Sequence, residues 1–217
     1  DLADIAAVEQ SAADDVSREV DQARLDPEPD PALLLRDVYG SSSTPSGAAA
    51  DSATGEPIRY SRAIKAALTD ALADDDRVFL AGIDVAGGNV FGLTRGLAEQ
   101  FPGRVWDTPI SETAIVGLGV GAAMAGLRPV VEIMYLDFIG VCLDQIMNQA
   151  AKLRYMTGGR AQVPLVIRTQ FGAGRSSGSQ HSQSLEVLLA HIPGLRVVMP
   201  STSADAYGLL RASIDDD

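Results

Sequence analysis

The chain has 217 residues, 46% of them hydrophobic, which is enough for one globular domain with additional sequence. Residues 1–56 hold 13 acidic and 3 basic residues, whereas residues 57–217 hold 16 and 14, so the net charge of −12 lies mostly in the first quarter of the chain. An acidic chain without a cluster of basic and aromatic residues is poorly suited to a phosphate backbone, so we expect no nucleic-acid partner.

The cysteine content and the hydropathy predict a cytoplasmic protein. Cys142 is the single cysteine, so no intramolecular disulfide can form, and its apolar neighbours at helical spacing favour an inert core thiol. The chain begins DLADIAAVEQ, without a basic segment followed by an apolar one, and it has no apolar run of the roughly 20 residues that span a bilayer. We therefore expect no membrane partner.

The first 56 residues are predicted to be a helical tail, residues 1–40, and a linker. From Asp4 to about Leu25, apolar residues recur every three or four positions among acids, which predicts an amphipathic helix. The sequence DPEPDP then ends this helix, because proline cannot continue it. Residues 41–56, SSSTPSGAAADSATGE, contain no bulky apolar side chain and predict a flexible linker before a domain over residues 57–217.

From residue 57 onward, predicted helices and apolar strands alternate. The helices are expected at 60–72, 93–101, from 112, 138–156, 183–192 and from 204, and the strands at 77–83, 104–108, 128–134, 163–169 and 195–200. This alternation indicates an α/β fold, with a mostly parallel, doubly wound sheet that has helices on both faces. Ligands bind such sheets beyond the carboxyl ends of the strands, where residues 109–112, 135–138 and 170–183 lie.

Glu112 opens a long run of small and apolar residues in DTPISETAIVGLGVGAAMAG, residues 107–126. A carboxylate there is poorly solvated, and a dry setting favours its protonated form, so Glu112 is the first candidate for a working acid. The alternative is a first-turn acid that the helix dipole stabilises. Gly117, Gly121 and Ala125 form a stripe that close packing explains without a ligand.

His181 lies in the long polar loop FGAGRSSGSQHSQ, residues 171–183, at the carboxyl end of a predicted strand. A loop histidine is most often merely exposed, but one at this edge is also a candidate proton donor. Neither this loop nor GGNVFG has the spacing of a nucleotide-binding glycine motif, and no Cys/His pair has metal-ligand spacing. We therefore expect neither a nucleotide nor a transition metal.

Six segments carry a family resemblance: GIDV (82–85), FGLTRGLAEQFPGRVWDTPISE (91–112), VGAAMAGLRPVVEI (120–133), DQIMNQAAK (144–152), QHSQS (180–184) and PGLRVVMPS (193–201). Together they resemble the beta subunit of thiamine diphosphate-dependent 2-oxo acid dehydrogenases, the decarboxylating component of pyruvate and branched-chain complexes. The resemblance implies the pyrimidine-binding domain of the thiamine diphosphate-binding fold. The acidic helix, DPEPDP and DVYG are similar to the tail of the alpha subunit, which implies an alpha–beta fusion.

This resemblance implies roles for individual residues. Glu112 matches the acid that hydrogen-bonds the aminopyrimidine ring of the cofactor and promotes its imino form, so that a carbanion nucleophile can form. Phe138 matches the aromatic residue that stacks on the pyrimidine, with Ile110 and Met134 as neighbouring wall residues; the alternative for all three is ordinary core. His181 matches the loop histidine of proton transfer and of acyl transfer to the lipoyl group.

The resemblance also implies ions and partners. A structural potassium ion would be held at Leu165, Val166, Ser213 and Asp216, largely by backbone carbonyls that leave no sequence signature. In this family the diphosphate and its Mg²⁺ are held by the alpha subunit, through a Gly-Asp-Gly motif and a later Asn, and residues 1–217 contain no such pair. We therefore expect an alpha-type domain fused upstream, a lipoyl-bearing acyltransferase core, an oligomer, and an isolated chain that is inactive. The family continues past the position of Asp217, so we also expect a domain truncated at its carboxyl end.

Two alternatives stay open, together with the choice among 2-oxo acids. A transketolase or deoxyxylulose-phosphate synthase uses a similar domain and the same acid, although QHSQS and DTPISE favour the dehydrogenase. A non-catalytic assembly module would use the glycine stripe of helix 112–126 to pack against a partner subunit.

Overall fold

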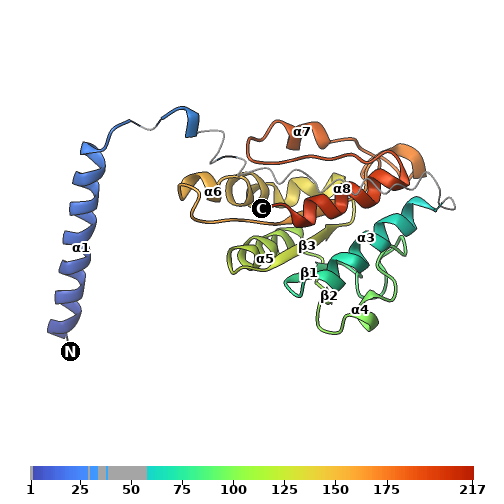
Figure 1. Ribbon diagram of the computed structural model, residues 1–217, viewed down its shortest axis with the longest axis horizontal. Helices are drawn as coiled ribbons and strands as arrows, with labels where there is room; N and C mark the ends of the chain where they lie inside the picture. The colour runs from blue at the N-terminus through green and yellow to red at the C-terminus, as the bar shows by residue number, and fades with distance from the viewer. Residues whose placement is uncertain (1, 29, 34–37, 39–57) are drawn as a thin grey trace. The chain divides into compact units, whose positions relative to one another are not determined.

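Two units make up the computed structural model, residues 1–34 and residues 35–217 (Figure 1). The structure describes residues 2–28, 30–33, 38 and 58–217. The predicted linker, residues 41–56, lies outside the described residues, as do most of the residues just before it.

Helix α1 (Leu2–Leu25) dominates the first unit and confirms the predicted amphipathic helix. Its apolar side chains are exposed within this unit, Val8 by 69% and Val16 by 64%. Polar side chains pair along the helix, for example Arg24 with Asp21 at 3.1 Å. Exposed pairs of this kind contribute little to stability. Because the described side chains of α1 are exposed, the unit itself buries neither face of this helix.

Four parallel strands form the sheet of the second unit, in the order β2-β1-β3-β4. They are β1 (Val78–Gly82), β2 (Val105–Asp107), β3 (Arg128–Ile133) and β4 (Val166–Thr169). The central strands β1 and β3 are buried along nearly their whole length, as apolar runs without alternation predict. The register places Gly82 beside Glu132 and Glu132 beside Arg168.

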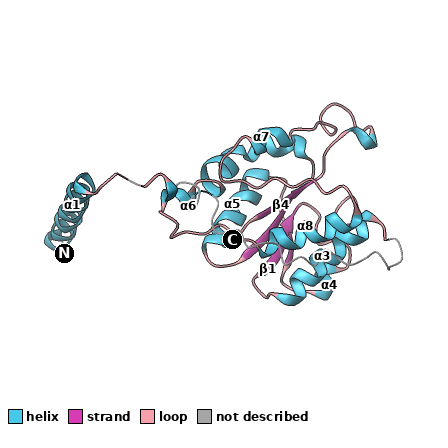
Figure 2. Ribbon diagram, turned by 45° about the horizontal axis from the view of Figure 1, so that its top comes forward, coloured by secondary structure: helices cyan, strands magenta, loops and turns pink. Residues whose placement is uncertain are grey.

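Helices cover both faces of this sheet, which confirms the predicted doubly wound α/β fold (Figure 2). On one face, α3 (Tyr60–Asp74) and α8 (Ser203–Asp215) lie side by side, with Leu68 and Leu210 in a core shared with Leu80 of β1 (Figure 1). On the other face, α5 (Glu112–Met124) contributes Ile115 to a core with Val131 of β3.

The predicted helix over 138–156 is wrong as a continuous α-helix. It consists of a 3₁₀-helix η2 (Leu136–Cys142), a π-helix η3 (Gln145–Ala150) and a short α6 (Leu153–Met156). The segment around Gly194 crosses this region so closely that a Cβ there would overlap the Ala151 carbonyl oxygen. Apolar spacing over so short a run does not separate the 3₁₀- and π-helices from an α-helix, because each differs from it by less than one residue per turn.

Other predicted elements change in length, and one is absent. Helices 93–101 and 183–192 shrink to α4 (Leu97–Gln100) and α7 (Glu186–Ala190). Residues 195–200, predicted as a fifth strand, form no strand in the described structure, where Val198 and Met199 are about half exposed at 47% and 48%. An apolar segment becomes a strand only where a neighbouring strand offers hydrogen-bonding partners, and β4 pairs only with β3 among the described strands.

Candidate functional site

The carboxyl ends of the parallel strands bring the three predicted binding segments to one edge of the sheet. Residues 109–112 follow β2, residues 135–138 follow β3 and residues 170–183 follow β4. A backbone hydrogen bond of 2.8 Å from Leu136 N to Gln170 O joins the second and third of these segments. This edge, called the carboxyl edge below, holds Glu112, Phe138 and His181.

Glu112 is the first residue of α5 and is buried, with 9% of its surface exposed. In the described part of the chain, no group hydrogen-bonds to its carboxylate. Thr113 Oγ1 donates to Val141 O at 2.8 Å, which fastens this end of α5 to η2. Neither Glu112 oxygen is among the fully buried unpartnered polar atoms of the described residues, so the carboxyl group remains accessible to a hydrogen bond from a bound group.

Cys142, at the end of η2, is fully buried, as predicted for a core thiol. Burial raises the pKa of this thiol to about 11, and the negative charge of the nearby Glu112 acts in the same direction. At neutral pH the thiol is therefore protonated and unreactive.

Aromatic rings gather around His181. The centroid of its ring lies 4.8 Å from that of Tyr135 and 5.2 Å from that of Phe138, both in edge-to-face contact. Tyr135 also meets Phe91 edge-on at 5.7 Å, and Arg175 lies over the Phe91 ring at 5.0 Å. The structure therefore brings the predicted proton carrier and the predicted stacking residue into direct contact, from loops after two different strands.

The two predicted wall residues differ in exposure. Met134 follows β3 directly and is half-buried, whereas Ile110 is 80% exposed. A groove of about 250 Å³ beside the start of α5 is mainly apolar. Its lining residues are Thr108, Pro109, Ser111, Ala114, Ile115 and Leu118. None of the four predicted cofactor contacts, Glu112, Ile110, Met134 and Phe138, lines this groove.

A buried ion pair next to this site was not predicted from the sequence. Glu132 is 4% exposed, forms an ion pair with Arg168, and accepts a hydrogen bond from Asn89 Nδ2 at 2.5 Å. Gly82 lets strand β3 approach closely at Glu132, because a Cβ at position 82 would lie 2.9 Å from the backbone carbonyl oxygen of Glu132. The sequence feature that could have predicted this ion pair is one charge of opposite sign inside each of two apolar strands, RPVVEI and VIRT.

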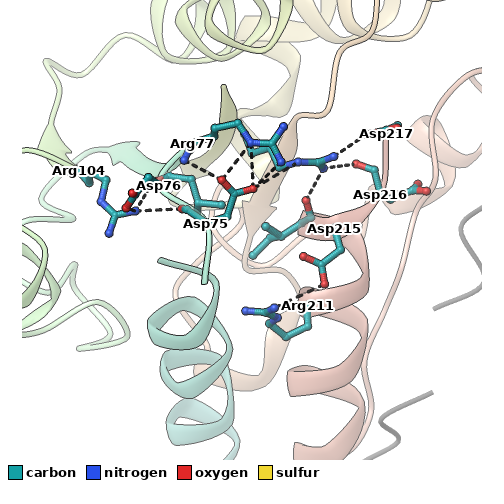
Figure 3. Close-up of polar contacts among 11 residues, drawn as sticks. Asp75, Asp76, Arg77, Arg104, Arg211, Asp215, Asp216 and Asp217 are labelled. Carbon is teal, nitrogen blue, oxygen red and sulfur yellow. Dashed lines mark hydrogen bonds and ion pairs between the residues drawn. The ribbon is translucent and has the colours of Figure 1, made fainter. Parts of the chain in front are cut away.

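Paired charges crowd the opposite edge of the sheet, called the amino edge below (Figure 3). Arg128, the first residue of β3, donates from Nη1 to the carbonyl oxygens of Ile214 at 2.8 Å and Asp216 at 2.9 Å. Its Nη2 pairs with Asp217 at 2.5 Å, and only 13% of its side chain is exposed. Arg128 thereby ties the end of α8 to the start of the sheet.

The residues predicted to hold potassium lie at β4 and at the end of α8. The Asp216 carbonyl accepts from Arg128 and its carboxylate pairs with Arg196, while Ser213 Oγ donates to Leu209 O at 2.8 Å. Two guanidinium groups thus contact Asp216 in the described structure, and the potassium site at these four residues stays a prediction.

Two features are absent from the described residues. No group of three or more His, Cys, Asp and Glu side chains is placed to hold a metal ion. None of the described helices combines the length and the apolar character that crossing a bilayer requires.

Sequence comparisons identify several beta subunits as relatives. A beta subunit of acetoin:2,6-dichlorophenolindophenol oxidoreductase from Bacillus subtilis is 49% identical over 174 residues, covering 74% of this chain and 51% of the relative. The 2-oxoisovalerate dehydrogenase subunit beta of B. subtilis is 46% identical over 160 residues, covering 73% and 49%. The mitochondrial pyruvate dehydrogenase E1 component subunit beta of Ascaris suum is 46% identical over 157 residues, covering 71% and 44%. The chain thus spans about half the length of these relatives, and the predicted resemblance to such beta subunits is confirmed.

The fold and a family match agree with these relatives. A solved structure described as a split gene transketolase, inactive beta4 tetramer, superposes with a TM-score of 0.59 at 18% identity, covering 74% of this chain and 49% of that one, which supports the fold alone. Residues 56–217 match the family described as the pyrimidine binding domain of transketolase. The chain therefore belongs to the transketolase pyrimidine-binding domain family.

Proposed function

We propose that this chain supplies the pyrimidine-binding half-site of a thiamine diphosphate-dependent 2-oxo acid dehydrogenase, which decarboxylates a 2-oxo acid and transfers the acyl group to a lipoyl group. The observation that carries the proposal is Glu112, buried at the carboxyl edge without a hydrogen-bonding partner among the described residues. The relatives named for pyruvate and 2-oxoisovalerate support the substrate class.

The residues at the carboxyl edge fit the aminopyrimidine end of the cofactor. When bound, thiamine diphosphate supplies a nucleophilic carbon and accommodates the electrons released by decarboxylation. Glu112 would hold a proton on a ring nitrogen, since its buried carboxyl group lacks another partner. Phe138 and Met134 would orient the flat ring, and exposed Ile110 would complete the wall only once a partner covers it. His181 would carry protons at the reacting end.

The remaining functions of the enzyme, diphosphate binding and acceptance of the acyl group, belong to partner domains in this proposal. An alpha-type domain, fused upstream, would hold the diphosphate and its Mg²⁺, because the described residues include no carboxylate cluster for a metal. A lipoyl-bearing acyltransferase core would receive the acyl group, and the enzyme would be an oligomer in the cytoplasm. The 80% exposure of Ile110 supports a site that two domains share.

Cofactor binding by the isolated chain tests this division. We expect calorimetry of the 217-residue chain with thiamine diphosphate and Mg²⁺ to show weak binding or none, because the diphosphate would lack its ligands. Micromolar binding would contradict the assignment of the diphosphate site to a partner domain.

Acetoin is a second candidate substrate, because acetoin oxidoreductase beta subunits from B. subtilis and Cupriavidus necator are 49% and 48% identical to this chain. Both substrates place a carbonyl carbon beside the bond that breaks. Assays of the assembled enzyme with pyruvate, branched 2-oxo acids and acetoin, each with lipoamide, distinguish the candidates. Turnover of sugar phosphates without lipoamide would favour the transketolase alternative, and no turnover of any substrate would favour an assembly module.

A further inference from the structure

The loop that carries His181 is closed at its neck, the name used here for residues 172 and 183 at its two ends. It joins β4 to α7, and Gly172 N donates to Gln183 O at 3.1 Å, so residues 172 and 183 meet. Residues 173–180 between them are exposed. An exposed polar loop has no core contacts of its own to fix a side chain, so the position of His181 depends on how this neck is held.

Asp137 provides the second hold on the neck. Its Oδ1 accepts two hydrogen bonds from Gln183, one from the backbone N at 3.1 Å and one from Nε2 at 2.9 Å. Two donors from one residue fix both the chain path and the side chain at Gln183. Burial alone would raise the pKa of Asp137, but the hydrogen bonds from Gln183 outweigh it and hold the pKa below its ordinary value. The carboxyl group is therefore a charged acceptor at neutral pH.

The same short helix also carries the ring that His181 touches. Phe138 follows Asp137 directly in η2, and its ring centroid lies 5.2 Å from that of His181. Gln183 stands two residues after His181. The histidine is thus held on two sides by consecutive residues of η2, one through hydrogen bonds to the loop and one through ring contact.

We propose that Asp137 is a positioning residue, which holds His181 against Phe138 and Tyr135 by binding Gln183. The catalytic consequence rests on the proposed function, in which His181 carries protons. The positional claim stands independently of it, because it concerns only where the imidazole ring lies.

Histidine resonances in nuclear magnetic resonance spectra of the full chain test the position. The chain has only two histidines, His181 and His191, so two ring signals are expected, which a His181→Gln variant assigns. Ring currents from Tyr135 and Phe138 displace the His181 signal in the wild type. We expect Asp137→Ala to move it toward the position of free histidine, with His191 unmoved. Asp137→Asn should restore it, since the amide oxygen still accepts from Gln183.

Asp144→Ala is the matched control, because Asp144 lies in the same segment but accepts from Asn148 at 2.6 Å. It should leave both signals in place. If Asp137→Ala unfolds the chain, Gln183→Ala removes the Nε2 hydrogen bond but keeps the one from the backbone N, so it should displace the His181 signal alone and by a smaller amount. An unmoved His181 signal in Asp137→Ala or Gln183→Ala, or an equal shift with Asp144→Ala, would overturn the proposal.

Turnover of the complete enzyme separates this proposal from the proposed function. We expect Asp137→Ala to lower kcat by about 10- to 100-fold with little change in KM, and Asp137→Asn to recover most of it, because a misplaced catalytic group slows chemistry more than binding. A displaced His181 signal with normal turnover would support the positioning role and contradict the catalytic role of His181.

Discussion

Two charged residues at opposite edges of the parallel sheet, Arg128 and Glu112, differ in their hydrogen-bonding partners. At the amino edge, the Arg128 guanidinium is matched to two carbonyl oxygens and to Asp217. At the carboxyl edge, Glu112 has no hydrogen-bonding partner among the described residues. Four further polar atoms there are fully buried without a partner: Thr108 Oγ1, Asp137 Oδ2, Thr169 Oγ1 and Ser182 Oγ.

The difference between the paired Arg128 and the unpartnered Glu112 distinguishes a residue that stabilises the fold from one that is available for function. A buried polar atom without a partner costs free energy, and folding alone gives no reason to keep several at one edge. The amino edge satisfies Arg128, but Arg211 Nη1 and, beside Asp217, Arg154 Nε and Nη1 are also buried there without a partner. We therefore base the division on two residues: the contacts of Arg128 serve stability, whereas Glu112 is kept free for a bound molecule or a partner domain.

The largest expected effect is on catalysis at the carboxyl edge. In the complete enzyme, Glu112→Gln should reduce decarboxylation at least about 100-fold, because an amide cannot take part in proton transfer. Steady-state kinetics with a 2-oxo acid measures the loss. Glu99→Gln, which changes an exposed acid of α4, is the control and should retain full activity. Near-normal turnover of Glu112→Gln would remove Glu112 from the mechanism.

The next effect concerns stability at the amino edge. Arg128→Met should lower the free energy of unfolding by about 2–4 kcal/mol, because the carbonyls of Ile214 and Asp216 lose their donor. Urea denaturation of the chain measures it.

Arg211→Met is the matched control for Arg128→Met. The partners of Arg211, Asp74 and Asp215, are 65% and 61% exposed, so its loss should cost less than about 1 kcal/mol. Equal losses for the two arginines would show that burial of the ion pair does not set its contribution.

The smallest effect is a pH dependence at the start of α8, away from both sets of buried groups. Thr202 and Asp205 form a capping box, and hydrogen bonds from Thr202 and Ser201 hold the pKa of Asp205 below its ordinary value. Its stabilising contribution is therefore complete above the unfolded-state pKa, near 4, and is lost as the pH falls through the lower folded-state value. Acid titration of the wild type and Asp205→Asn should show a difference at pH 6 that vanishes at low pH. A difference that persists there would contradict this origin.

The sequence predicted the fold well where apolar runs are continuous. The buried strands β1 and β3 follow directly from such runs, whereas helix α1 follows from apolar residues that recur every three or four positions. Residues 195–200 were predicted wrongly because a strand depends on a partner that local sequence does not encode. The helix over 138–156 was predicted without its 3₁₀ and π sections, because apolar spacing over so short a run does not distinguish these helix types from an α-helix.

At the site, the sequence placed residues at the correct edge but not their mutual contacts. Glu112 stood out because it precedes a long apolar run, and the structure shows it buried. The contact of His181 with Tyr135 and Phe138 joins loops about 45 residues apart in the sequence, and no spacing rule predicts it. The roles of these residues in catalysis stay predictions until the complete enzyme is assayed.

The comparison of the two edges is tested most directly by unfolding Glu112→Gln and Arg128→Met side by side in urea. If Glu112 is kept for function, Glu112→Gln should leave the free energy of unfolding nearly unchanged, because no hydrogen bond to Glu112 is lost among the described residues and the amide has the same shape. Arg128→Met should lower it. A loss in Glu112→Gln as large as that in Arg128→Met would contradict the account, because Glu112 would then be a structural residue.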